Sequence, residues 1–344
     1  MKARYTDVVQ HPSQEHMVFS YGQGYYVVKT STGEIIKQVQ PSEENKSSGL
    51  EHFRTTTFSK DGKYLATTGD DKEIRVWDTT NWEQQSARPV LKRINAMQFT
   101  KDGSQVVEAD KFGDVYVFPT EVSETTAAEK QEAMKKNKPI VGHVSMLTDM
   151  TLSDDEKYII TADRDEHVRV SRFPNGYNIE SYCMGHTDVI TNIQLLPWAP
   201  NVLATVGGDC TFRLWDFMVG KELHSLQYKS HVEKYVPEGV DANSMDPIVM
   251  KMELSTKDKI AVLSFAKAPI LLVLKWDEST SSFEFNSIVE TSAPVLSFGF
   301  DIEGNIWTAL DDETRVAVYL RKDGSFEPTD GARTNNINTA ETPE

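Results

Sequence analysis

The chain has little cysteine and no long apolar run. Its 344 residues include two cysteines, Cys183 and Cys210, too few for a disulfide framework or a cysteine-rich zinc site, so a reducing compartment is expected. The most apolar stretch, residues 260–276, is interrupted by a lysine and a proline and is too short for a transmembrane helix. The first 20 residues contain no apolar signal region, so neither secretion nor membrane association is predicted.

Basic residues are also in short supply. Lysine and arginine number 36 against 52 aspartates and glutamates, which gives a formal net charge of −16. Such a surface repels phosphate backbones on average, so the chain is not expected to provide the principal surface for a nucleic acid. The most basic cluster, residues 135–138, shares its segment with four glutamates. It is expected to be a solvated loop, with RNA contact or a role in import as the alternative.

The sequence lacks the motifs that carry most known catalysis. It contains no phosphate-binding or dinucleotide-binding glycine motif, no paired-cysteine motif, no metalloprotease helix motif and no nucleophile elbow. Acidic clusters at 70–73 and 311–313 coincide with repeat turns, where solvated acids are expected rather than metal ligands. The two cysteines fall in repeat segments and are expected to be small buried side chains. No catalytic residue, cofactor or metal site is predicted in this chain.

What the sequence does contain is an internal repeat. An acidic turn followed by a short β-rich run recurs seven times, with spacings of 46, 41, 53, 44, 59 and 45 residues and an average of 48. The turn markers are Glu15, Asp61, Asp102, Asp155, Ala199, Asp258 and Glu303. This period, with almost no helical pattern, is typical of propeller blades built from four antiparallel strands. We predict an all-β, seven-bladed propeller over residues 1–320.

The pattern also predicts where the chain departs from the repeat. The two long spacings require insertions near residues 119–140 and 230–246. Both are polar, so they are expected to be loops that project from the disc. The segment 321–344 has almost no apolar residue after Phe326. It is therefore predicted to be a disordered polar tail.

Two repeats carry a dipeptide motif that indicates the type of propeller. GDDKEIRVWD (69–78) and GGDCTFRLWD (207–216) match the WD-repeat pattern, in which an aspartate six residues before the tryptophan holds a tight turn. An upstream Gly-His element supplies a histidine that can join the aspartate, a hydroxyl and the tryptophan in a buried hydrogen-bond network, which rigidifies a blade. The predicted network residues are His143, His186, Asp71, Asp165, Asp209, Trp77 and Trp215. Phe118 and Ser171 replace the tryptophan in blades three and four. We predict a WD-repeat propeller that serves as an interaction platform.

One stretch contains residues that the WD-repeat pattern does not require. Residues 142–193, with ADRDEHVRVSR at 162–172 and IESYCMGH at 179–186, resemble blades four and five of the WD-repeat, non-catalytic subunit of the tRNA (guanine-N7)-methyltransferase. A second, looser match is ADKFGDVYVF at 109–118. The resemblance covers about 110 residues.

The resemblance implies that the chain is a scaffold without an active site. In that family a separate catalytic subunit binds S-adenosylmethionine and methylates a guanine in the tRNA variable loop, while the propeller docks on it and supports its active conformation. We therefore expect a heterodimer with the catalytic subunit, contact with tRNA mainly through that partner, no cofactor on this chain, and residence in the nucleus. The acidic composition fits this division, since a basic partner can make most phosphate contacts.

The resemblance also implies a partner-binding site on blade four. The family's basic contact falls on Arg169, where a guanidinium would form a salt bridge with a carboxylate of the catalytic subunit. Further candidates around the same turn and on the neighbouring blade are Arg164, Glu166, His167 and Lys111. The repeat alone offers another interpretation, because Arg75 and Arg213 occupy the same repeat position. Arg169 would then be an ordinary surface arginine.

Two other functions stay open from the residues. A generic WD-repeat adaptor, such as a substrate receptor or a chromatin scaffold, would bind several peptides weakly at the central channel instead of one methyltransferase tightly. A propeller with its own hydrolase or lyase site would need titratable groups with shifted pKa values clustered in that channel.

Overall fold

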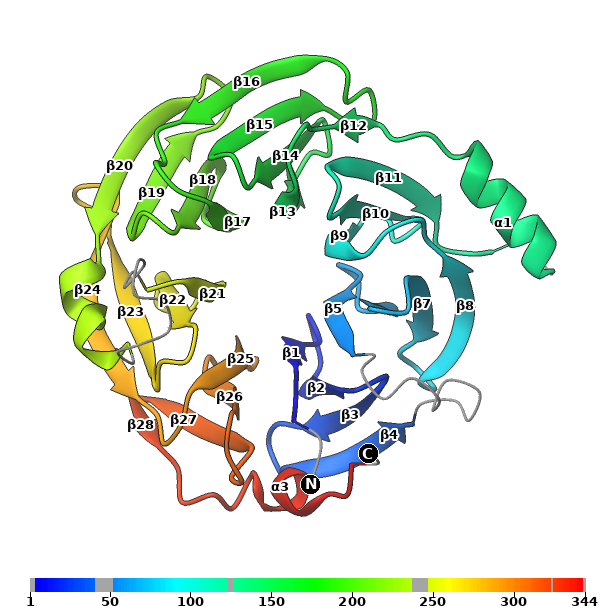
Figure 1. Ribbon diagram of the computed structural model, residues 1–344. Coiled ribbons are helices and arrows are strands. Elements are labelled where there is room, and N and C mark those ends of the chain that lie inside the picture. The colour runs from blue at the N-terminus through cyan, green and yellow to red at the C-terminus, as the bar shows by residue number, and fades with distance from the viewer. Residues whose placement is uncertain (1–3, 41–51, 123–125, 237–246, 323, 343–344) are drawn as a thin grey trace.

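The chain forms a closed ring of four-stranded antiparallel sheets (Figure 1). The computed structural model describes residues 4–40, 52–122, 126–236, 247–322 and 324–342. Each sheet uses four consecutive strands. The strands are β1 (Asp7–Gln10), β2 (His16–Tyr21), β3 (Gly24–Lys29) and β4 (Glu34–Val39) in blade one; β5 (Phe53–Phe58), β6 (Tyr64–Gly69), β7 (Glu73–Asp78) and β8 (Glu83–Pro89) in blade two; β9 (Ile94–Phe99), β10 (Gln105–Asp110), β11 (Asp114–Pro119) and β12 (Val141–Gly142) in blade three; β13 (Leu147–Leu152), β14 (Tyr158–Asp163), β15 (His167–Arg172) and β16 (Ile179–Met184) in blade four; β17 (Ile190–Leu196), β18 (Ala199–Gly207), β19 (Thr211–Asp216) and β20 (Lys221–Gln227) in blade five; β21 (Val249–Ser255), β22 (Ile260–Phe265), β23 (Ile270–Asp277) and β24 (Ser282–Glu290) in blade six; and β25 (Val295–Phe300), β26 (Ile306–Leu310), β27 (Val316–Lys322) and β28 (Ser325–Pro328) in blade seven.

The predicted all-β, seven-bladed propeller is confirmed. Helical structure in the described residues is confined to short segments outside the blades. These are α1 (Ala127–Lys136), α2 (Lys229–Val232), the 3-10 turn η2 (Glu233–Tyr235) and α3 (Asn335–Thr339). None of the helices described is long and apolar enough to cross a membrane.

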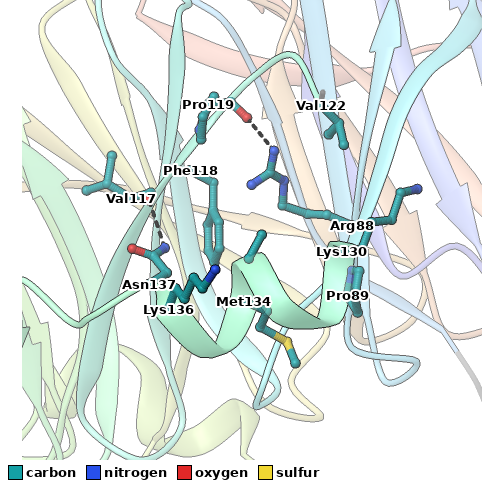
Figure 2. A pocket seen from close by; sticks show the side chains of 11 residues that line it. Arg88, Pro89, Val117, Phe118, Pro119, Val122, Lys130, Met134, Lys136 and Asn137 are labelled. Atoms are coloured by element: carbon teal, nitrogen blue, oxygen red, sulfur yellow. Dashed lines mark hydrogen bonds between the residues drawn. The ribbon is translucent and has the colours of Figure 1, made fainter. Parts of the chain in front are cut away.

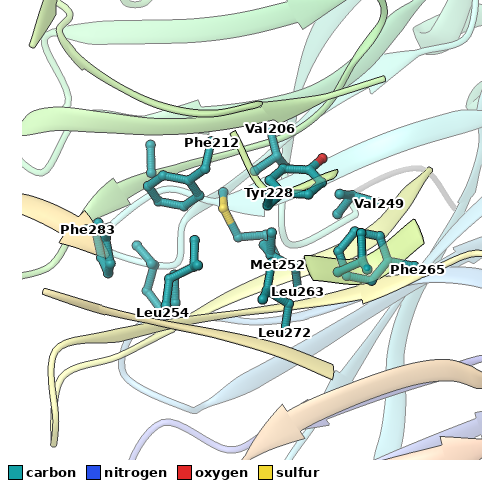
Figure 3. Packing of buried hydrophobic residues seen from close by; sticks show 14 of the residues in the cluster. Val206, Phe212, Tyr228, Val249, Met252, Leu254, Leu263, Phe265, Leu272 and Phe283 are labelled. Carbon is teal, nitrogen blue, oxygen red and sulfur yellow. The ribbon is translucent and has the colours of Figure 1, made fainter. Parts of the chain in front are cut away.

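The core lies between adjacent blades. A middle strand such as β22 is buried at every position because neighbouring blades cover both of its faces. Figure 3 shows one such interface, where side chains from blades five and six pack together. The Phe212 and Phe283 ring centroids there are 4.9 Å apart in an edge-to-face arrangement, a favourable geometry for aromatic pairs. Each of the seven seams between adjacent blades therefore contains its own apolar cluster in the described residues.

The innermost strands are tied to one another by side chains. Adjacent blades are separate sheets, so the backbone amides on these strands find acceptors on the neighbouring blade. The Asp7 carboxylate accepts from the Thr56 amide at 3.2 Å, and Gln98 accepts from the Leu152 amide at 3.0 Å. The Asp149 carboxylate accepts from the Ile193 amide at 2.8 Å. These contacts hold the blades in register around the channel.

The C-terminal segment covers the seam between blades seven and one, so the prediction of a disordered tail at 321–344 is wrong. Residues 321–322 complete β27, β28 follows, and α3 lies on the seam (Figure 1). Ile337 is fully buried, and its carbonyl accepts from the Tyr5 hydroxyl at 3.0 Å. The Asn338 side chain exchanges two 2.9 Å hydrogen bonds with the Val316 backbone. In this segment, hydrogen bonds made by polar side chains hold the chain on the seam. A prediction based on low apolar content does not take such bonds into account. Residues 323 and 343–344 of the predicted tail lie outside the described residues.

The first insertion contains a helix rather than only a projecting loop. Helix α1 begins with a capping box formed by Thr126 and Glu129, a signal that is readable in the sequence. The helix borders a cleft of about 270 Å³ against blades two and three (Figure 2). Lys130 donates to the Ala87 carbonyl at 2.7 Å, which fixes the helix to blade two. Of the second predicted insertion, residues 237–246 lie outside the described residues.

Candidate partner-binding site

Blade five contains the complete buried network that the WD-repeat pattern predicts. His186 contacts Asp209 through Nδ1 at 3.0 Å and Thr205 through Nε2 at 2.7 Å. The Trp215 indole donates to the same threonine hydroxyl at 2.9 Å. Burial alone would raise the pKa of Asp209, but the hydrogen bond with His186 holds that pKa well below its usual range. The network therefore locks the turn between β18 and β19.

Blade four contains a variant of this network with a different aspartate. His143 contacts Asp163 through Nδ1 at 2.9 Å and Thr161 through Nε2 at 2.8 Å. The assignment of this role to Asp165 is wrong. Asp163 ends β14, and its carboxylate also accepts from the amides of Asp165 and His167 at 2.9 and 3.1 Å. Asp163 thus holds the turn from the end of β14. Asp165 lies at the tip of the turn and is exposed.

Blade two keeps the tryptophan contact but not the histidine. The Trp77 indole donates to the Thr67 hydroxyl at 3.1 Å. The Asp71 carboxylate lies 2.6 Å from the Arg75 guanidinium and is joined to no histidine in the described part of the chain. Asp71 still accepts from the Glu73 amide of its turn at 3.4 Å, so it occupies the predicted turn position, and the ion pair with Arg75 takes the place of the histidine contact.

Three arginines occupy the same repeat position, and their partners separate them. Arg75 pairs with Asp71 and Glu73, both at 2.6 Å. Arg213 pairs with Glu222 at 2.5 Å and with Asp209 at 3.5 Å. Arg169 pairs with no carboxylate in the residues that the structure describes. Two of the three are thus neutralised within their own blade, and Arg169 is not.

Neutral acceptors hold the Arg169 guanidinium in place. Its Nε donates to the Ser171 hydroxyl at 2.9 Å, and its two terminal nitrogens donate to the carbonyls of Gly142 and Gly176 at 3.1 and 2.7 Å. Ser171 is fully buried where the repeat has tryptophan. Three of the five guanidinium N–H groups are engaged, and two can still donate. Burial lowers the pKa of Arg169 below its usual value, which reflects a cation that lacks a counter-charge.

Arg169 lines a cleft of about 460 Å³ with apolar side chains at its rim. Tyr182 pairs with Arg169 across β15 and β16 and is 42% exposed, and Met184 on the same strand is 59% exposed. Val144, in the loop before β13, is fully exposed. Exposed apolar groups around a desolvated cation are typical of the centre of a protein interface. Sequence reasoning missed these three residues, although the alternation of β16 could have indicated two of them.

The other predicted residues lie around the same cleft. Arg164 and Glu166 are exposed on the turn between β14 and β15, and Glu166 has a φ of +70°. His167 is half-buried, with Nδ1 3.5 Å from Asp163. Of this turn, Asp165 and His167 line the cleft, whereas Arg164 and Glu166 do not.

The blade-three turn that carries Lys111 packs against the loop at the cleft. Gly113, with a φ of +105°, lies so close to the His143 and Ser145 carbonyls that an added Cβ would be 2.5 and 2.7 Å from them. A left-handed turn at glycine therefore brings the two blades together. Phe112 is 55% exposed, and the Lys111 ammonium lies 5.3 Å from its ring centroid. The structure thus brings Lys111 into the same neighbourhood as the blade-four turn.

The central channel contains titratable groups, as the hydrolase hypothesis requires. Burial raises the pKa of Asp149 to about 7. Lys251 contacts Asp7 and Glu253, each at 3.3 Å, and burial raises the pKa of Glu253. Both Asp149 oxygens accept from backbone amides, and the Lys251 ammonium also donates to the Val8 carbonyl at 2.8 Å. These groups tie strands together, and none of them activates a nucleophile in the described residues.

Comparison with solved structures supports the fold. The WD40 repeats of RRP9 superpose with a TM-score of 0.70 at 15% identity, covering 90% of this chain and 88% of that one. A chain of the mitotic checkpoint complex superposes with a TM-score of 0.69 at 13% identity, covering 91% of this chain and 86% of that one. At these identities the likeness concerns the propeller alone.

Sequence comparison is more specific. The tRNA methyltransferase TRM82 WD40 domain matches residues 13–139 and 120–323. The tRNA (guanine-N(7)-)-methyltransferase non-catalytic subunit WDR4 of Bos taurus is 31% identical over 89% of this chain and 71% of its own length. The Homo sapiens WDR4 subunit is 30% identical over 82% of this chain and 67% of its own length. The Kluyveromyces lactis TRM82 subunit is 29% identical over 86% of this chain and 71% of its own length. The chain therefore belongs to the TRM82 WD40-domain family.

Proposed function

We propose that this chain is the non-catalytic subunit of a tRNA (guanine-N7)-methyltransferase and that it docks on the catalytic subunit through the Arg169 cleft. The family assignment carries the first part of the proposal. The lack of an ion-pair partner for Arg169 among the described residues carries the second, because a half-buried guanidinium with two unused N–H groups is the place where an incoming carboxylate adds most.

The proposed interface combines charge with apolar contact. A carboxylate of the catalytic subunit pairs with Arg169, while Tyr182, Met184 and Val144 exclude water around it. Lys111 and the exposed residues Arg164, Glu166 and His167 form the polar rim. Rim charges steer the encounter more than they strengthen the complex.

The division of labour follows from the composition of the chain. S-adenosylmethionine binds to the catalytic subunit, and tRNA contacts the complex mainly through that subunit, because a chain with a net charge of −16 repels phosphate. The propeller contributes a rigid surface that supports the active conformation of its partner. We propose nuclear residence on the family resemblance alone, and microscopy of the tagged chain tests it.

The test is co-expression with the candidate guanine-N7 methyltransferase subunit of the same organism. Wild-type chain is expected to co-purify in a one-to-one complex that methylates tRNA. Arg169→Glu places a carboxylate against a carboxylate and is expected to raise the dissociation constant more than about thirtyfold, the scale for truncating a desolvated charge pair. Methylation is expected to fall in parallel at fixed subunit concentration.

The matched control is Arg172→Glu. Arg172 lies on the same strand, is exposed and pairs with Glu180 at 2.9 Å. It is absent from the cleft, so its reversal is expected to leave the complex intact. Circular dichroism and an unfolding curve establish that both variants fold.

Other outcomes separate the alternatives. Binding that survives Arg169→Glu would move the interface elsewhere on the ring and leave the family function standing. A wild-type chain that does not associate with the methyltransferase, but captures several peptides weakly, would favour the generic WD-repeat adaptor.

A further inference from the structure

An exposed aromatic ring lies on a turn of blade three, close to the Arg169 cleft. Phe112 is 55% exposed and lies between β10 and β11, in the turn that corresponds to the β14–β15 turn of blade four. Both turns join the second and third strands of their blades, so they are on the same face of the disc, and the two blades are neighbours in the ring (Figure 1). Lys111 of this turn is a rim charge in the proposed interface, whereas Phe112 has no role there.

Hydrogen bonds on three sides fix the backbone of this turn. The buried Asp110 carboxylate accepts from the Phe112 amide at 2.7 Å. The Lys111 amide donates to a backbone carbonyl of the segment before β9 at 2.9 Å, and the Gly113 carbonyl accepts from the His143 amide of blade four at 2.8 Å. A ring on a fixed turn loses little conformational freedom when a partner covers it. Phe112 is therefore preorganised for contact with another molecule.

The same turn connects Phe112 to the apolar rim of the Arg169 cleft. An added Cβ on Gly113 would lie 2.5 and 2.7 Å from the His143 and Ser145 carbonyls, so the turn packs against the two residues that flank Val144. Val144 is fully exposed and lines the cleft. Exposed apolar residues therefore continue from the rim of the cleft across the seam to blade three. Adjoining apolar groups on a surface are typical of protein interaction sites.

Two ammonium groups lie close to the Phe112 ring. The Lys92 ammonium is 4.3 Å from the ring centroid and the Lys111 ammonium is 5.3 Å from it. Lys92 belongs to the segment between β8 and β9, so the two cations come from different loops. Neither lysine forms an ion pair with a carboxylate of the described residues. Two cations at one ring repel each other, and a carboxylate near both relieves that repulsion. The charges therefore favour an acidic partner segment.

We propose that an acidic segment of the catalytic subunit covers this turn, with an apolar side chain on Phe112 and a carboxylate shared by Lys92 and Lys111. The inference rests on the proposed function and adds to the same interface a second anchor, separate from Arg169. Aromatic anchors contribute a large share of the binding energy in protein interfaces. A protein segment fits better than RNA, because the buried Asp110 carboxylate beneath the turn and the net charge of −16 both disfavour phosphate.

The test measures the kinetics of association between the full chain and the catalytic subunit by surface plasmon resonance at low and high salt. Phe112→Ala removes the ring and is expected to raise the dissociation constant about tenfold, mainly through faster dissociation. The double variant Lys92→Glu, Lys111→Glu is expected to slow association about tenfold at low salt. At high salt its effect is expected to be much smaller, because steering by exposed charges is screened.

The matched controls lie on blade six. Phe285 is 40% exposed on β24. Lys267 is exposed on the turn between β22 and β23, which corresponds to the turn that carries Lys111. Phe285→Ala and Lys267→Glu are expected to bind as wild type does. Because more than half of the Phe112 side chain is exposed, Phe112→Ala is expected to keep the wild-type unfolding midpoint, which thermal unfolding checks.

Three results would overturn the inference. Wild-type affinity of Phe112→Ala, in a complex that Arg169→Glu still weakens, would remove Phe112 from the interface and leave the proposed function standing. Unchanged assembly of Phe112→Ala, together with weaker tRNA binding by the assembled complex, would assign the ring to a nucleobase instead. A wild-type chain that does not bind the catalytic subunit would overturn the proposed function, and this inference with it.

Discussion

At the scale of single residues, Asp163 and Asp165 show that sequence position does not settle which side chain holds a turn. Counting six residues back from Ser171 selects Asp165, as in blade five. The structure selects Asp163, whose carboxylate accepts from His143 and from two turn amides. We predict that Asp163→Ala lowers the free energy of unfolding by about 2–3 kcal/mol, because it leaves buried donors without an acceptor. Asp165→Ala is expected to change it by less than about 0.5 kcal/mol. Urea unfolding of both variants tests this, and equal costs would contradict the assignment.

Glu108 is a second residue whose environment the sequence does not reveal. It takes the repeat position of Thr67, Thr161 and Thr205, is 2% exposed, and one carboxylate oxygen has no hydrogen-bond partner. Burial, followed by repulsion from Asp110 and Asp114, raises its pKa well above the ordinary 4.5. Its protonated form is therefore favoured in the folded state, and ionisation costs stability as the pH rises above 4.5.

We therefore predict that Glu108→Thr stabilises the protein and that the gain depends on pH. The difference from wild type is expected to be smallest below pH 4.5, where Glu108 is protonated in both folded and unfolded chains. It is expected to grow with rising pH until the folded-state pKa is passed, and to be constant above it. Thermal unfolding at a series of pH values measures this difference. A gain that shrinks with rising pH would show that Glu108 is stabilised as the carboxylate.

At the scale of elements, α3 closes the ring. Blade one is built entirely from the first four strands, so no strand is exchanged between the ends of the chain in the described residues. Ile337 instead packs among Tyr5, Tyr26 and Val316 across the seam. We predict that Ile337→Ala lowers the free energy of unfolding by about 3 kcal/mol, the usual cost of a large-to-small change in a core. Asn335→Ala, on the exposed side of α3, is the control. Equal stability of both variants in denaturant titration would mean that α3 does not hold the seam.

The elements also show where sequence reasoning succeeded. The strands followed from the 48-residue period, and the blade-five network followed from the Gly-His and WD spacing. Helix α1 differs from the expected loop because Thr126 and Glu129 form a local capping box, which the repeat period does not reveal. The order of the C-terminal segment was missed because Asn338 and Tyr5 supply contacts that composition does not record.

At the scale of the whole molecule, the negative net charge disfavours the binding of tRNA to this chain alone. With a net charge of −16, the isolated chain is expected to retain no tRNA at about 0.15 M salt, where non-specific binding already depends on phosphate neutralisation. The complex with the catalytic subunit is expected to bind tRNA with an affinity that falls steeply as salt increases. Gel-shift titration of the chain, the partner and the complex measures this. Tight tRNA binding by the chain alone would contradict a division of labour based on charge.

The whole molecule also shows the limit of sequence reasoning about the candidate site. Arg169 was selected through the family resemblance, because the repeat gives Arg75 and Arg213 the same position. In the three-dimensional structure those two are paired within their blades, whereas Arg169 is held by Ser171 and two carbonyls. Tyr182 and Met184 are likewise exposed on β16, the outermost strand of blade four.

The most direct test of the docking account is amide hydrogen exchange on the complex with the catalytic subunit. We predict that complex formation slows exchange at residues 111–114, 143–146 and 164–168 and along β16, because these segments surround the Arg169 cleft. Exchange at the outer strands of blades six and seven is expected to be unchanged. Protection confined to those blades, with no change around Arg169, would contradict the proposed interface.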